Sequence, residues 1–265
     1  MIDKPYRRII RPFSLSTNVE GVSSEQDPYL QGDPFWEGST KDHYFDNRDE
    51  YAPEYTSLIR AYRIIEKDLI RILDFIEPSN ANLSTYSHRL YEILLRACTE
   101  FETNCKGILE ANEYSKSGYC NISDYCKINA SSRLSDYELR IGIWHDDKKT
   151  FRPFSDWAEK DKSLSWYQDY NTVKHNRSGQ FKLAKLENVL MAISGVLVLL
   201  FSQFHFRCFC VYPEFALYQL RAGWYASDHS IFEIKPPQNW TEDEHYNFDW
   251  SKLSKESERF GTYGF

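Results

Sequence analysis

The chain has 265 residues, of which 16% are aromatic and 27% are charged, and its formal net charge at pH 7 is −7. With 11 glycines and 10 prolines, it is neither collagen-like nor a Pro/Gly-rich low-complexity protein, and its many aromatic residues argue against disorder over most of its length. The acidic balance excludes a generally basic protein that binds nucleic acid without specificity, so any such contact has to come from a local patch.

The six cysteines give little sign of a metal site or of disulfide bonds. They lie at positions 98, 105, 120, 126, 208 and 210, and no two of them form a Cys-x-x-Cys pair. Neither their spacing nor their density is typical of zinc sites or of disulfide-rich secreted proteins. Since no secretory signal peptide is visible either, we expect a cytoplasmic protein with reduced thiols, no metal and no cofactor.

Two long helices are predicted early in the chain. Apolar residues recur at helical spacing from Pro53 to Ile76, with charged residues on the other face. A second helix is predicted from about residue 84 to Asn112, with Ser84 or Thr85 as its N-cap. Because the connection between the two helices is short, we expect them to form an antiparallel hairpin.

Residues 113–163 are mixed in character and are predicted to be an insertion. The alternation of Tyr137–Trp144 indicates a strand, and Thr150–Phe154 is predicted to return as the second strand of a hairpin. Pro153 places this second strand at the edge of a sheet, because proline has no N–H to donate.

Two more helices are predicted after the insertion. Leu164–Arg177 is short and polar, whereas Phe181–Phe206 is long and apolar, with Ser178 as its expected N-cap. The segment Val189–Phe204 is shorter than the roughly 20 residues that span a membrane. We therefore predict a buried helix at the centre of the protein and no membrane partner.

These elements predict a mainly α protein, an up-and-down four-helix bundle over residues 54–206 with a small β-hairpin insertion. Residues 1–53 are expected to form an N-terminal arm that packs on this body. Residues 207–265 form a C-terminal extension in which Ile231–Lys235 is a predicted strand. Both termini are aromatic-rich and irregular, and the last fifteen residues are expected to be loosely held.

The segment Ser165–Arg177 carries the most unusual group of polar side chains. On a helix, Tyr167, Asn171, Lys174 and His175 share roughly one face. Asn171 and His175 are four residues apart, so their side chains can touch. Such a face is either a solvated surface flanked by aromatic anchors or a site.

The residue types in this segment suit chemistry on a phosphate. Histidine exchanges a proton near neutral pH, and Lys174 and Arg177 can hold an anion. Asn171 can orient the imidazole of His175 or a substrate hydroxyl. A group of this kind can cleave RNA without a metal, because the histidine assists the 2′-hydroxyl and a cation stabilises the charged phosphorane. We count Tyr167 and Tyr170 among the candidate substrate contacts.

The order of helices over residues 54–206, together with YNTVKHNR, resembles the HEPN superfamily of helical bundles. The ribonuclease signature of that family is an arginine, a polar residue that is often asparagine, three free positions and a histidine. Asn171 and His175 match it, whereas Tyr170 occupies the place of the arginine that is taken to contact the scissile phosphate. The resemblance implies an RNA-directed protein of a bacterial defence or toxin system. It also implies a homodimer with a degenerate, metal-independent endoribonuclease site at its interface.

Two questions stay open from the sequence. HEPN proteins often carry an acidic residue on the second helix, and Glu100 or Glu102 would then pair with His175 and raise its pKa. The alternative is a solvated acidic face, in which Arg96 forms a surface ion pair with Glu100. The alternative function, favoured by Tyr170, is a non-catalytic helical module that dimerises or binds a partner.

Overall fold

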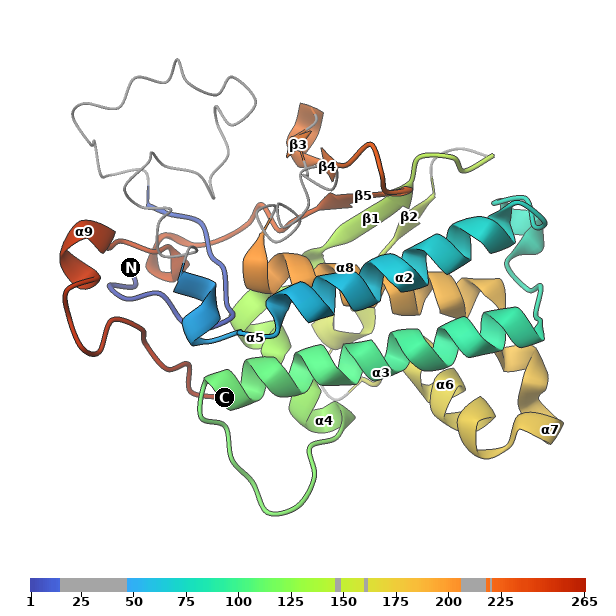
Figure 1. Ribbon diagram of the computed structural model, residues 1–265, viewed down its shortest axis with the longest axis horizontal. Helices are drawn as coiled ribbons and strands as arrows, with labels where there is room; N and C mark the ends of the chain where they lie inside the picture. The colour runs from blue at the N-terminus through green and yellow to red at the C-terminus, as the bar shows by residue number, and fades with distance from the viewer. Residues whose placement is uncertain (15–46, 146–148, 160–161, 206–217, 220) are drawn as a thin grey trace.

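The computed structural model describes residues 1–14, 47–145, 149–159, 162–205, 218–219 and 221–265. Within these residues the protein is mainly α-helical, with a small antiparallel sheet on one side (Figure 1). Three long helices and one shorter helix pack together, and we call them the helical body: α2 (Tyr55–Leu73), α3 (His88–Ala111), α6 (Ser165–His175) and α8 (Leu186–Phe204).

Helices α2 and α3 form because each has a continuous apolar stripe. The predicted stripe of α3 is buried along its length, from Leu90 through Phe101 to Ile108. Its N-cap, however, is Ser87, whose Oγ accepts a hydrogen bond from the Leu90 N–H at 3.1 Å. The expected caps Ser84 and Thr85 precede the helix, because Ser84 lies in a turn and Tyr86 then pairs with the backbone of Lys185 before the helix begins.

Helix α8 lies at the centre of the helical body, as predicted, and nearly all of its residues are buried. It is the one described helix long and apolar enough to cross a membrane, and 89% of its most apolar window is buried inside the protein. Ser178 is not its N-cap. The short helix α7 (Arg177–Gln180) and a 3₁₀ turn precede α8, and the N–H groups of Leu186 and Glu187 donate to the carbonyls of Thr85 and Leu83 instead.

The sheet joins the insertion to the C-terminal segment. Its order is β2–β1–β5–β4–β3, and every neighbouring pair is antiparallel. The predicted hairpin is confirmed, and so is the predicted strand near residue 232. The hairpin is one side of a wider sheet, because β5 pairs with β1 over four residues. The strands are β1 (Glu138–Ile141), β2 (Thr150–Phe151), β3 (Tyr218–Gln219), β4 (Tyr225–Ala226) and β5 (Phe232–Lys235).

The described parts of the two termini pair with each other and pack on α8. Ile2 and Tyr6 form parallel backbone bridges to Tyr246 and Gly261, and the Ile10 N–H donates to the Ser202 carbonyl of α8 at 2.9 Å. The expectation of a loosely held C-terminal end is wrong, because aromatic contacts bury part of it, including Phe260. Three further short α-helices lie within the described residues: α4 (Ile122–Tyr125), α5 (Ile128–Ser132) and α9 (Trp250–Leu253).

Four of the six cysteines fall in the described residues, and all four are free thiols. Cys98 and Cys105 are fully buried on α3, as their spacing predicts, and burial raises the pKa of both thiols well above the ordinary value. They are therefore small core residues rather than reactive groups. Cys208 and Cys210 lie outside the described residues.

Candidate functional site

Helix α6 is anchored at its start by the insertion and ends at His175. At its start, the Ser165 N–H donates to Asp156 Oδ2 at 3.1 Å, and the Trp166 indole N–H donates to the Pro153 carbonyl at 2.8 Å. The helix ends at His175, because Asn176 leaves the helical conformation and its side chain caps α7 by accepting from the Gly179 N–H. Arg177 therefore lies on α7, not on the same helix as the other polar residues.

The inner face of α6 forms a polar cluster with α3, which we call the Glu102 cluster. The Tyr167 hydroxyl donates to Glu102 Oε1 at 2.9 Å, and the Tyr170 hydroxyl lies 3.5 Å from the same oxygen. The Lys174 ammonium donates to the Tyr170 hydroxyl at 3.1 Å and lies over its ring. On α3, Lys106 forms an ion pair with Glu102 one turn further on, at 4.0 Å. The carboxylate thus has partners from both helices.

Charge in the Glu102 cluster changes the pKa values of its members. Burial, followed by the negative charge of Glu102, raises the pKa of Tyr167. Burial also raises the pKa of Tyr170, and the hydrogen bond to Tyr170 raises the pKa of Lys174. At neutral pH both phenols therefore keep their protons and Lys174 stays charged.

The outer face of α6 is open to solvent. His175 is exposed, Lys174 is exposed although its ammonium reaches inward to the Tyr170 hydroxyl, and Asn171 is half-buried. Neither the Asn171 side chain nor the His175 side chain has a hydrogen-bond or ion-pair partner among the residues that the structure describes. They share a face, as predicted, but they do not bond to each other. The imidazole is thus free to meet a ligand.

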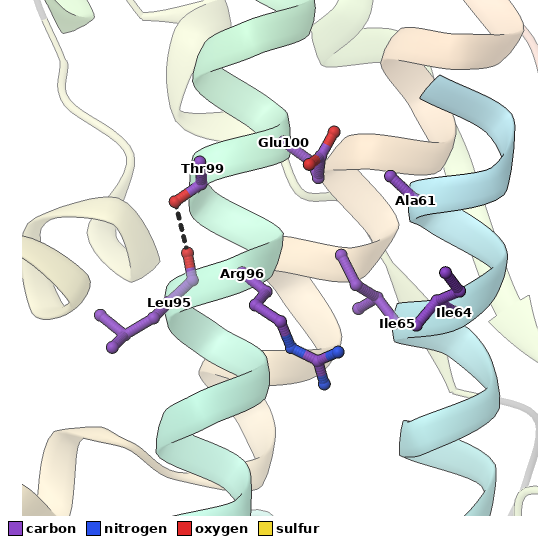
Figure 2. A pocket seen from close by; sticks show the side chains of 7 residues that line it. All are labelled: Ala61, Ile64, Ile65, Leu95, Arg96, Thr99 and Glu100. Carbon is purple, nitrogen blue, oxygen red and sulfur yellow. Dashed lines mark hydrogen bonds between the residues drawn. The ribbon is translucent and has the colours of Figure 1, made fainter. Parts of the chain in front are cut away.

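Glu100 does not belong to this face. Residues that are two positions apart in a helix point in directions about 200° apart around its axis. Glu100 and Glu102 therefore point to opposite sides of α3. Figure 2 shows Glu100 with Arg96 beside α2, in a groove of about 340 Å³ that Ile64 and Ile65 also line. Burial raises the pKa of Glu100. Arg96 pairs across this groove with Asp68 at 2.7 Å and not with Glu100.

The Glu102 carboxylate is also not an ion-pair partner of His175. Its near oxygen accepts from Tyr167, and none of the ion pairs within the described part of the chain joins it to an imidazole. Of the two predicted acidic partners, Glu102 thus faces α6 and Glu100 does not. Glu102 positions the hydroxyl groups of Tyr167 and Tyr170. These two rings are buried, with Tyr170 only 2% exposed, so the surface available to a ligand comes from Asn171, Lys174, His175 and Arg177.

One neighbour of this face was missed at the sequence level. The Arg177 guanidinium lies 5.9 Å from the ring centre of Tyr91 on α3, and that ring in turn contacts Phe181 at 6.1 Å. Tyr91 lies seven residues before Cys98 and eleven before Glu102, which puts all three on one face of α3. The spacing alone places Tyr91 on the same face of α3 as Glu102. It could not identify Tyr91 as a neighbour of Arg177 until α6 was known to lie along this face.

No protein-family model, curated protein or solved structure matches this chain, so the site is interpreted from its own geometry. Among the described residues, no group of three or more His, Cys, Asp and Glu side chains is arranged to hold a metal ion.

Proposed function

We propose that this chain is a HEPN-like protein that binds RNA through the exposed face at the end of α6. The observation that carries the proposal is the gathering of Lys174, His175 and Arg177 at one solvent-facing place on a chain whose net charge is −7. In such a chain, non-specific attraction to phosphates is weak, so a local group of cations has to supply it. An up-and-down four-helix arrangement and a homodimer are parts of the same proposal.

Tyr170 favours binding over rapid cleavage. In the HEPN signature this position belongs to an arginine, but here the side chain is buried and its hydroxyl lies between Lys174 and Glu102. Because this phenol is buried and its hydroxyl is engaged by Glu102 and Lys174, it is not placed to donate to the charge that develops on a phosphorane. Contact with the phosphate therefore falls to Lys174 and Arg177, which lie one turn or more beyond it.

RNA cleavage is the second candidate function, and the exposure of His175 favours it. The imidazole would take the proton of a 2′-hydroxyl while that oxygen bonds to the neighbouring phosphorus. The bond from phosphorus to the 5′-oxygen then breaks, and this oxygen takes a proton from water. The products are a 2′,3′-cyclic phosphate and a 5′-hydroxyl, and the reaction needs no metal.

Salt dependence of binding tests the RNA proposal. Fluorescence anisotropy with labelled single-stranded RNA gives the affinity of the wild type and of the Lys174→Gln, Arg177→Gln double variant. Each phosphate contact contributes about 0.7 to the slope of log affinity against log salt for a single strand. We expect the double variant to bind more weakly, with a slope about 1.4 smaller.

A matched control separates this face from general charge. Lys252 and Lys255 are exposed on the C-terminal segment, and the Lys252→Gln, Lys255→Gln double variant changes the net charge by the same amount. We expect its RNA affinity and salt slope to equal those of the wild type. Equal effects of the two double variants, or wild-type binding that does not respond to salt, would refute the proposed face.

Cleavage is tested separately with total RNA, with and without a chelator, alongside His175→Ala. Specific cuts that resist the chelator and vanish in the variant would establish the enzyme. Intact RNA with the wild type, together with salt-dependent binding, would leave RNA binding as the function.

A further inference from the structure

Four aromatic rings gather on the surface where α3 begins and α7 ends, and we call them the aromatic cluster: Tyr86, His88, Tyr91 and Phe181. Phe181 lies at its centre. Its ring centre is 4.6 Å from that of His88, 5.7 Å from that of Tyr86 and 6.1 Å from that of Tyr91. In Figure 1 the start of α3 and the helix α7 lie at the same end of the helical body.

These rings are displayed to solvent from a fixed backbone. Tyr86 is 51% exposed, His88 is exposed, and Tyr91 and Phe181 are half-buried. The backbone of Tyr86 pairs with that of Lys185, and just before it in the chain the carbonyls of Leu83 and Thr85 accept from the first turn of α8. A ring held in this way loses little freedom when a flat ligand stacks on it.

The charge around the aromatic cluster is positive. Arg177 lies over Tyr91, and Lys182 follows Phe181 and is exposed, with no hydrogen-bond or ion-pair partner among the described residues. Two other nearby cations are neutralised, because Arg89 pairs with Glu92 and Lys185 pairs with Glu187. What remains is a set of rings bordered by two cations, Arg177 and Lys182, for which the described part of the chain offers no acidic partner.

The aromatic cluster is continuous with the face proposed for RNA. Arg177 belongs to both, since it contacts Tyr91 and directly follows the α6 face that carries Lys174 and His175. A polyanion that follows these cations toward α7 therefore meets the rings next. Rings interleaved with cations are the surface that proteins use to bind single strands, in which unpaired bases stack on aromatic side chains while the phosphates meet positive charge.

We propose that the aromatic cluster binds the unpaired bases of single-stranded RNA, with the exposed ring of Tyr86 as the stacking surface and Phe181 packed edge-to-face beside it. This inference rests on the proposed RNA-binding function and specifies its ligand as a strand with free bases. Stacking is tolerant of sequence because every base has a flat π face. The cluster therefore selects unpaired strands over duplexes without choosing a base.

The test compares two ligands with equal charge: a short oligouridine and an abasic ribose-phosphate strand of the same length. We expect wild-type protein to bind the oligouridine about tenfold more tightly, and Tyr86→Ala to lose about tenfold in affinity for the oligouridine only. Tyr86→Trp should bind the oligouridine about as tightly as the wild type does, because it keeps a stacking ring. Tyr119→Ala is the control, since Tyr119 is 98% exposed and lies outside the aromatic cluster.

Each result has a distinct meaning. Equal wild-type affinity for the two strands, or an equal loss for both in Tyr86→Ala, would overturn the stacking proposal while RNA binding through the cations stood. No binding of either strand by wild-type protein would overturn the proposed function and the stacking proposal together. A melting temperature of Tyr86→Ala equal to that of the wild type excludes unfolding as the cause of any loss.

Discussion

The ammonium group of Lys174 donates a hydrogen bond to the hydroxyl of Tyr170, one helical turn earlier, at 3.1 Å. In the HEPN resemblance that we propose, Tyr170 takes the place of the signature arginine, and its hydroxyl also lies 3.5 Å from Glu102. A residue that would contact a ligand in that signature here positions a neighbouring cation. Replacing this tyrosine should therefore alter the pKa of Lys174 more than it alters the fold.

Tyr170→Phe tests this relationship. The ring still fills its place, but Lys174 loses the hydrogen bond that is the main cause of its raised pKa. We expect the pKa of Lys174 to fall toward its ordinary value, with a stability loss of about 0.5–1.5 kcal/mol. NMR titration of the lysine side chains measures the shift, and Lys252 is the internal control. An unchanged titration of Lys174 would mean that the hydrogen bond does not form in solution.

Ser87→Ala removes the side-chain cap of α3. The Leu90 N–H then loses its acceptor, and we expect the free energy of unfolding to fall by about 1 kcal/mol in urea denaturation. Ser84→Ala is the matched control, because Ser84 is exposed and caps no helix. Equal losses in the two variants would show that α3 begins earlier than Ser87.

Leu197→Ala tests the central position of α8. Leu197 is 3% exposed, so the substitution leaves a cavity and should cost about 2–5 kcal/mol of stability. Ile64→Ala serves as a comparison on α2, where the side chain is 47% exposed and the cost should be clearly smaller. Denaturant unfolding of both variants measures the difference, and similar small losses would contradict a buried α8.

Gly107→Ala tests the packing of the N-terminal arm on α3. A β-carbon at this position would collide with the guanidinium of Arg8. That guanidinium is buried and held by the Tyr51 carbonyl, Gln203 and Glu54, so it has little room to move. We expect a loss of about 1–3 kcal/mol, measured by thermal or urea unfolding. Gly264→Ala should be neutral, because no atom of the described residues lies within 4 Å of its added carbon.

Glu244 makes stability depend on pH in acid. Burial alone would raise its pKa, but hydrogen bonds from Arg133 and Thr241 outweigh burial and lower it to about 2. The folded state therefore binds the proton less readily than the unfolded chain does. The stabilisation is fully present above the ordinary carboxyl pKa, near 4.5, and is lost as the pH falls toward 2.

Glu244→Gln is the matching variant. It cannot ionise, so we expect it to be less stable than wild type at neutral pH and to approach the wild type as the pH falls through this window. Urea midpoints across the pH range measure the gap between the two proteins. A gap that stays constant from neutral pH to pH 2 would rule out the ion pair with Arg133 as its source.

The sequence predicted what depends on periodicity and missed what depends on contacts distant in the chain. The stripe from Leu90 to Ile108 identified α3, because helical spacing is a local property. The pairing of β1 with β5 joins residues nearly one hundred positions apart, and no local pattern specifies such a pairing. The predicted N-cap of α3, Ser84 or Thr85, was wrong for a similar reason. The bridge between Tyr86 and Lys185 sets where the helix begins, so the cap is Ser87.

The candidate site was predictable only in part. The shared face of Asn171, Lys174 and His175 followed from helical geometry, but whether Glu100 or Glu102 faced it depended on the rotation of α3 against its neighbours. The inward turn of Tyr170 toward Glu102 required the same knowledge. The aromatic cluster combines Tyr86, residues of α3 and Phe181 from the turn before α8, so it becomes visible only in three dimensions.

The backbone bridges from Ile2 to Tyr246 and from Tyr6 to Gly261 join the N-terminal and C-terminal segments into one unit that packs on the end of α8. During synthesis, Ile2 and Tyr6 can therefore form their final backbone pairs only after Tyr246 and Gly261 have been made. A protein shortened at residue 206 would lose the partners of its own N-terminus and uncover apolar side chains such as Ile10 and Phe13. Insoluble product would be the expected result of such a deletion, even with every residue of the helical body intact.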